Sequence, residues 1–255
     1  PCLAMVLSAI LSFLLQVTAD AEIFQFDRLW PQLQQPWYFQ APYAVAVDTN
    51  GNVYIADTGN DQIQKFDASG AYIMRWGAFG SGNAQFDRPG SITVDASGNV
   101  YVADTGNNRI QKFDPTGAYL SQWGTPGAGD GQFNGPAGIV VDSVGNVYVA
   151  DTGNNRIQKF DQTGAYLSQW GAPGAGDGQF NGPAGIAADH AGNLYIADTN
   201  NNLIRKITPA GIAMPAGAAA GSPSAGRAGR CTVRVVPRPG GDWTSIRPWC
   251  PLTMP

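Results

Sequence analysis

Short runs in which apolar and β-branched residues alternate with polar ones follow one another along most of the chain, and Gly, Asn or Asp bounds each run. An alternation with a period of two is typical of half-buried β-strands joined by turns. In the clearest stretch the pattern predicts four strands, at residues 138–142, 146–151, 156–161 and 165–171. Nothing between these runs has a helical pattern, which excludes a βαβ arrangement.

The residues between the runs indicate turns. Gly145 and Gly164 stand where a hairpin turn needs a positive φ, and residues 152–155 join the two middle strands. The asparagines of this middle turn tolerate left-handed backbone geometry. In two copies they are Asn107, Asn108, Asn154 and Asn155.

The four-strand unit recurs with a fixed period. The aspartates that close the second strand of each unit, Asp57, Asp104, Asp151 and Asp198, are spaced 47 residues apart. Residues 95–141 and 142–188 differ at only six of 47 positions, which indicates a recent internal duplication. The sequence therefore predicts four modules of equal length.

A repeated unit of four short antiparallel strands is the sequence signature of a β-propeller blade. Because one sheet cannot bury both of its faces alone, neighbouring blades must stack on one another. Two recurring aromatic positions are best placed between the blades. They are held by Phe66, Phe113 and Phe160, and by Trp76, Trp123 and Trp170.

The repeated sequence resembles the NHL repeat family. The match lies in "GIVVDSVGNVYVADTGNNRIQKFDQTGAYLSQWG" and in the connecting "GAGDGQFNGP", and it covers about residues 39–211. The resemblance implies a propeller of the six-bladed kind, used mostly as an interaction platform. Because this chain has four clear copies, we expect an all-β propeller with an incomplete or open ring.

Three segments lie outside the repeats. Residues 1–21 resemble a secretory signal peptide, with an apolar stretch from Val6 to Val17 and a cleavage pattern that ends at Ala21. Residues 22–38 are predicted to form a degenerate lead-in strand. Residues 212–255 are an atypical tail rich in Ala, Gly, Pro and Arg, and we expect it to be disordered.

Charge and cysteine content narrow the function classes. Through residue 211 the chain has 10 Lys or Arg against 18 Asp or Glu, a net charge of −8. This acidity argues against nucleic-acid binding, which relies on Lys and Arg at phosphates. No cysteine lies in the repeats, so a Cys-rich zinc site or RING domain is not predicted there. Cys231 and Cys250, both in the tail, could pair in an oxidising compartment.

The sequence predicts no catalytic residue, no cofactor and no metal site. Nearly identical blades present the same groups around a ring, which does not suit a division of labour between acid, base and nucleophile. The single histidine, His190, is expected to be a solvated turn residue. The four spaced aspartates are assigned a structural role as acceptors for the backbone amides of their own turns. A calcium site at these aspartates is a weaker alternative, because the spacing of a calcium loop is absent.

The candidate binding surface is the end of the blades where the turn between the second and third strands meets the link to the next blade. The position after this turn varies between copies, and the link carries an exposed acid in two of them. The predicted binding residues are Gln62, Arg109, Arg156, Leu203, Asp130 and Asp177. As an alternative, the arginines bridge neighbouring blades through nearby aspartates.

The favoured function is that of a secreted, non-catalytic binding or scaffold propeller, found outside the cell, in the periplasm or at the cell surface. Its partner would be a protein or a small ligand, with no nucleic acid and no membrane span after signal cleavage. Self-association is expected if the ring is open. The alternatives are a lactonase-like or lyase-like propeller enzyme with a metal at the central axis, and an RNA-binding NHL propeller.

Overall fold

The computed structural model describes residues 38–209, which form four antiparallel sheets in the order of the chain. Blade 1 contains β1 (Pro42–Val47), β2 (Val53–Asp57), β3 (Gln62–Phe66) and β4 (Tyr72–Trp76). Blade 2 contains β5 (Pro89–Val94), β6 (Val100–Asp104), β7 (Arg109–Phe113) and β8 (Tyr119–Trp123). Blade 3 contains β9 (Pro136–Val141), β10 (Val147–Asp151), β11 (Arg156–Phe160) and β12 (Tyr166–Trp170). Blade 4 contains β13 (Pro183–Ala188), β14 (Leu194–Asp198) and β15 (Leu203–Ile207).

Each strand pairs with the next one along the chain, so every blade is an up-and-down meander, as the alternating pattern predicts. The glycines predicted to have positive φ have it, with 92° at Gly145 and 91° at Gly164. Between the second and third strands the chain makes a single 3₁₀ turn that ends in a left-handed residue, Asn155 in blade 3. These turns are η1 (Thr58–Asn60), η2 (Thr105–Asn107), η3 (Thr152–Asn154) and η4 (Thr199–Asn201).

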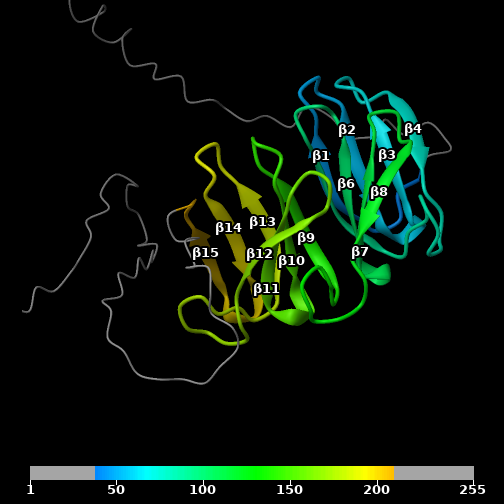
Figure 1. The fold of residues 1–255 in the computed structure, drawn as a ribbon. Coiled ribbons are helices and arrows are strands. Elements are labelled where there is room, and N and C mark those ends of the chain that lie inside the picture. Colours follow the sequence, from blue (N-terminus) through cyan, green and yellow to red (C-terminus); the bar gives the residue numbers. More distant parts are fainter. Residues whose placement is uncertain (1–37, 210–255) are drawn as a thin grey trace, which may run out of the picture. The chain divides into compact units, whose positions relative to one another are not determined.

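The blades lie side by side through their first strands. β1 packs against β5, β5 against β9, and β9 against β13, and Figure 1 shows the four sheets following one another in this order. Within residues 38–209, no strand of blade 1 packs along a strand of blade 4. The predicted open arrangement of the propeller is therefore confirmed for the described blades.

The core lies between the blades, where the sequence places its aromatic residues. The ring centroids of Trp76 in blade 1 and Phe113 in blade 2 are 5.7 Å apart. The equivalent pair one blade further on, Trp123 and Phe160, is 5.9 Å apart. Such tilted contacts add to the free energy gained from burying the rings. The predicted interface role is confirmed for Trp76, Phe113, Trp123, Phe160 and Trp170. Phe66 of blade 1 instead packs against Phe39 and Tyr72, with ring centroids 5.8 Å away in both cases.

The close packing of blades 3 and 4 leads to a testable difference between two equivalent glycines. A Cβ on Gly138 of β9 would collide with the backbone carbonyl of Ala184 on β13. Gly185, which occupies the same repeat position in blade 4, has only the Ala197 side chain nearby, at 3.6 Å. We expect Gly138→Ala to lower the free energy of unfolding by about 1–3 kcal/mol through overpacking.

Chemical denaturation with urea measures this difference. At a concentration where the chain is monomeric, the matched variant Gly185→Ala should stay within about 0.5 kcal/mol of the unchanged protein, as is usual where a new side chain meets no obstacle. Equal losses in the two monomeric variants would contradict the difference in packing between the two glycines.

The predictions for the signal peptide at 1–21, for residues 22–37 and for the tail at 212–255 fall outside the described residues, as do Cys231 and Cys250. In the part of the chain that the structure describes, no helix is long and apolar enough to cross a membrane.

Candidate functional site

Each blade is built around one buried carboxylate at the end of its second strand. In blade 2 this residue is Asp104, which has no exposed surface. Its Oδ1 accepts the backbone N–H of Asp87 at 2.8 Å, and its Oδ2 accepts Nε of Arg109 at 2.7 Å. The side-chain amides of Asn107 and Gln111 also donate to Oδ2, at 2.9 and 3.1 Å. Burial raises the pKa of the Asp104 carboxyl, and these hydrogen bonds oppose that shift.

Arg109 connects this carboxylate to the link between blades 1 and 2. Its Nη1 donates to the Ser81 carbonyl at 2.7 Å, and its Nη2 donates to the carbonyls of Gly82 and Gln85 at 2.8 and 2.9 Å. Nη1 also donates to Oε1 of Gln122 on β8 at 2.7 Å. Arg109 is only 7% exposed. A single guanidinium thus fixes the turn, the link and the outer strand of its blade in one arrangement.

The other blades vary this arrangement in ways that keep the carboxylate satisfied. Arg156 repeats the Arg109 contacts in blade 3. In blade 1 neutral side chains replace the cation, and Gln62 and Gln64 each donate to Oδ2 of Asp57 at 2.8 Å. In blade 4 the usual arginine position holds Leu203. The cation that binds Asp198 is instead Arg205, two residues further along the chain.

The four aspartates have a structural role, as predicted, but the residues that donate backbone hydrogen bonds to them are not the predicted ones. Their side chains do not cap their own 3₁₀ turns. The backbone amide that each one accepts belongs instead to a residue 17 positions earlier, in the link that enters the blade. The physical reason is that the link crosses directly over the turn, as the Gly106 N–H bonded to the Asp87 carbonyl at 2.8 Å shows.

The turn and the link therefore lie together at one end of the blades. We call the exposed surface of residues 78–88, 125–135 and 172–182 the linker face. Asp130 and Asp177 are exposed on it, as predicted. Phe79 is 71% exposed, and the side chain of Arg88 is equally exposed while its Nε pairs with Asp87 at 3.0 Å.

Three of the other predicted binding residues are not displayed on this face. Gln62, Arg109 and Arg156 are only 6–8% exposed, and they donate to buried carboxylates. These three side chains are therefore corrected to structural residues, in line with the bridging alternative. Leu203 is 44% exposed at the start of β15 in blade 4, and it stays a predicted binding residue. Phe79 and Arg88 are the exposed residues that the sequence reasoning missed, and their departure from the Pro and Gly of the other copies was the available signal.

The opposite end of the blades is made of tight turns that half-buried aspartates stabilise. In the turn after β7, Oδ1 of Asp114 accepts the Thr116 hydroxyl at 2.6 Å and the Ala118 amide at 3.0 Å. The hydroxyl bond and the amide bonds lower the pKa of this carboxyl. Asp67 and Asp161 repeat this arrangement, and their pKa values are lowered for the same reason. The hydrogen bonds that these carboxylates accept therefore come from their own turns.

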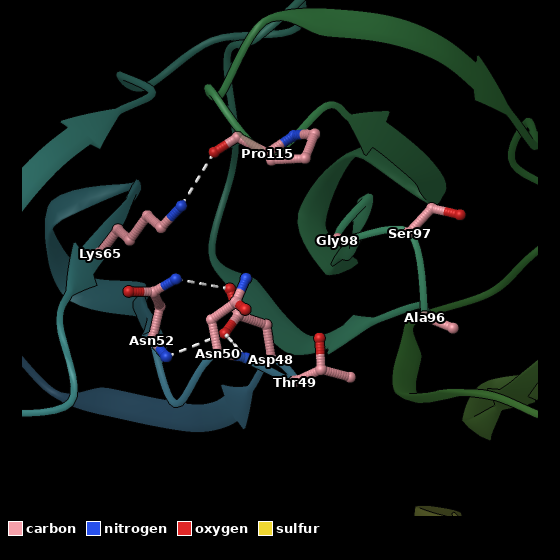
Figure 2. Close-up of a pocket in the computed structure, with 9 residues that line it drawn as sticks. All are labelled: Asp48, Thr49, Asn50, Asn52, Lys65, Ala96, Ser97, Gly98 and Pro115. Atoms are coloured by element: carbon pink, nitrogen blue, oxygen red, sulfur yellow. Dashed lines mark hydrogen bonds between the residues drawn. The ribbon is translucent and has the colours of Figure 1, made fainter.

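A small polar pocket of about 130 Å³ lies at this end, between blades 1 and 2. Figure 2 shows Lys65 reaching across it to the carbonyl of Pro115, at 3.0 Å. Asn52 and Asp48 bond to each other on the same side, with Nδ2 of Asn52 at 2.8 Å from Oδ2 of Asp48. The Lys65 ammonium also lies 4.9 Å from the ring centroid of Tyr54. The lysine is therefore used to join the two blades.

Tyrosines at this end form a second repeated contact. The Tyr54 hydroxyl donates to Oδ2 of Asp48 at 3.1 Å, and Tyr101 and Tyr148 donate to their equivalent aspartates at 3.0 Å. Burial, together with the neighbouring carboxylate, raises the pKa of each of these phenols well above its usual value. They remain protonated donors at physiological pH.

Among residues 38–209, no three His, Cys, Asp or Glu side chains converge on a point that could hold a metal ion. His190 is exposed in the turn between β13 and β14, where the sequence places it.

The repeats match the model of the NHL repeat at residues 39–66, 86–113, 133–160 and 180–207. With the four antiparallel blades, this match shows that the chain belongs to the NHL repeat β-propeller proteins. No curated protein sequence matches the chain.

Several solved structures share the fold. A streptogramin B lyase is 22% identical with a TM-score of 0.54, over 67% of this chain and 52% of that one. A virginiamycin B lyase from Staphylococcus aureus, solved with quinupristin, is 21% identical with a TM-score of 0.53, over 67% and 53% of the two chains. A chain of a nidogen/laminin complex is 22% identical with a TM-score of 0.52, over 66% and 61%. This chain thus spans about half the length of the two lyases, and the likeness concerns the fold alone.

Proposed function

We propose that this protein is a non-catalytic binding scaffold that recognises its partner, a protein or a small ligand, through the linker face. The observation that carries the proposal is the rigid attachment of variable, exposed loops. In blade 2, Arg109 binds three carbonyls of the link from below, while Phe79 and Arg88 project from the same link into solvent. Loops held by a rigid scaffold are the usual location of recognition residues.

Phe79 and Arg88 are suited to such contacts. Aromatic and arginine side chains contribute more than others to binding free energy when a partner covers them. The third and fourth blades are entered by links with Pro126 and Pro173 at the position of Phe79. The link into blade 2 therefore presents recognition residues that the other two links lack, although the framework below the links is repeated.

The alternative of a propeller enzyme is weakened by how the repeated acids are used. The carboxylates of Asp57, Asp104 and Asp151 are fully buried, and each accepts several hydrogen bonds from its own blade. A general acid or base needs access to the reacting group. The two lyases and the nidogen/laminin chain share only the fold with this protein, so they favour neither reading over the other.

The proposed partner is not a nucleic acid. The chain has a net charge of −8 through residue 211, and Asp130 and Asp177 add negative charge to the linker face itself. Phosphate binding needs the opposite sign. The proposed location outside the cytoplasm rests on the signal-like sequence of residues 1–21.

Site-specific photo-cross-linking in the producing cells tests the proposal. A photoreactive phenylalanine analogue at position 79 should give a discrete cross-linked species. The same analogue at position 144, where Val144 is 80% exposed at the opposite end of the blades, should give none. Arg88→Ala should reduce the yield at position 79 at least about tenfold, given the usual weight of arginine at interfaces. Cross-linking at position 144 alone, or equally at the two positions, would contradict recognition by the linker face.

A further inference from the structure

At the two ends of the row of described blades, apolar residues are exposed at strand positions that are buried or half-buried in the inner blades. On β1 of blade 1, Tyr43, Val45 and Val47 point away from blade 2 and are 71%, 63% and 60% exposed. We call these three residues the leading face. The intervening residues of the same strand, Ala44 and Ala46, pack against the core shared with blade 2.

The central residue of the leading face, Val45, has a buried counterpart in blades 2 and 3. The residues at the Val45 position are Ile92 in blade 2 and Ile139 in blade 3, and they are 5% and 4% exposed. Each belongs to the core formed with the preceding blade. Val45 thus has the character of a core residue with no preceding blade to pack against among residues 38–209.

Blade 4 exposes the complementary surface. Ile204 on β15 is 71% exposed and Tyr195 on β14 is 37% exposed. We call these two residues the trailing face. The residues at the Ile204 position in blades 1 to 3, Ile63, Ile110 and Ile157, are all completely buried against the blade that follows.

We infer that a second copy of this chain covers these surfaces, with the leading face of one copy on the trailing face of the other. The occupant follows from the internal interfaces, because what buries a trailing residue such as Ile110 is the leading side of the next blade, including Ile139 and Val149. Blade 1 carries that same side, so the pair of surfaces repeats an interface that occurs three times within the chain. A head-to-tail contact of this kind closes into a ring when the rotation permits.

Two copies would place eight blades around one axis, which is within the range of about four to eight found in propellers. Closure would also bury the exposed apolar ends, which are otherwise liable to unspecific association. This inference does not depend on the linker face, because the two terminal surfaces lie on the flat sides of blades 1 and 4.

Sedimentation velocity of the full chain over a range of concentrations tests the inference, with three charged variants. Val45→Glu places a carboxylate on the leading face, and Ile204→Glu places one on the trailing face. Val144→Glu is the control at an exposed apolar residue of an inner blade. The unchanged protein and Val144→Glu should associate to twice the monomer mass. Each terminal variant should associate at least about 100-fold more weakly, because a carboxylate would be buried without a partner. Circular dichroism of each variant checks that the blades stay folded.

Mixing the two terminal variants gives the decisive result. The Val45→Glu copy keeps a good trailing face and the Ile204→Glu copy keeps a good leading face, so the mixture should regain a one-to-one pair that neither variant forms alone. Failure to regain it would overturn the head-to-tail arrangement and indicate a face that pairs with itself. A monomer at all concentrations, or association that neither variant weakens, would overturn the inference entirely.

Discussion

Replacing Asp104 by alanine is expected to lower the free energy of unfolding by about 3–5 kcal/mol, as removal of one partner from a buried ion pair usually does. The loss arises because Arg109 stays buried without its carboxylate, while the Asp87 amide and the side-chain amides of Asn107 and Gln111 lose their acceptor. Urea denaturation followed by tryptophan fluorescence measures the change.

Two further variants separate this effect from a general loss of charge. Asp177→Asn removes an exposed carboxylate from the linker face and should change stability by less than about 0.5 kcal/mol. The double variant Asp104→Ala/Arg109→Leu should cost clearly less than the sum of its single variants, because the two groups act as one network. Strict additivity would mean that the two side chains do not depend on each other.

Phe113→Ala is expected to cost a similar amount, about 3–5 kcal/mol, because it opens a cavity between two blades. The Phe113 ring is completely buried, and its centroid lies 5.7 Å from those of both Trp76 in blade 1 and Phe86 in the link. Neighbouring blades cannot move together to fill the space without disturbing their strands. Thermal and urea unfolding measure the loss.

The repeats supply a milder variant for the same site. Ile207 stands at the Phe113 position in blade 4 and packs in the core there, so Phe113→Ile should cost less than Phe113→Ala. Phe79→Ala removes a ring that is 71% exposed and should leave stability within about 0.5 kcal/mol. A loss at Phe79 equal to that at Phe113 would show that the interface does not account for the stability.

Much of the fold could be predicted from the sequence because the determining signals are local and repeated. The period of two placed the strands to within a few residues, and the turn glycines were identified by their position. The tilted contact between Trp123 and Phe160 follows from an aromatic pattern that the first three copies repeat. Repetition also predicted the open ring, since too few copies are present to suit the six-bladed form.

The use of the polar residues could not be predicted in the same way. Asp104 accepts an amide 17 residues away, and Arg109 binds carbonyls 24–28 residues away. No local pattern shows that the link folds back over the turn. Arginine is seldom buried, so the sequence alone predicts a variable arginine after a turn to lie at the surface. In blade 4 the arginine stands at position 205 and Leu203 takes its usual place. This shift is the sequence signal that the arginine of each blade pairs with a nearby aspartate.

Each blade thus combines an invariant buried aspartate with an exposed link, and the link into blade 2 differs in sequence from the two that follow it. Gln62, Arg109 and Leu203 differ because their blades satisfy the central aspartate in different ways. Phe79 differs from Pro126 and Pro173 at a position where the link is exposed. Variation between repeats therefore marks recognition only where the side chain reaches solvent.

The unfolding free energy of Arg109→Gln tests most directly whether the arginines after the turns stabilise the fold. Gln62 shows that glutamine fits this position in blade 1, so the variant should fold. It would still lose the bonds from the guanidinium to the carbonyls of the link. We predict a decrease of about 1–3 kcal/mol relative to the unchanged protein. A decrease of less than about 0.5 kcal/mol would contradict the structural role and return Arg109 to the candidate binding residues.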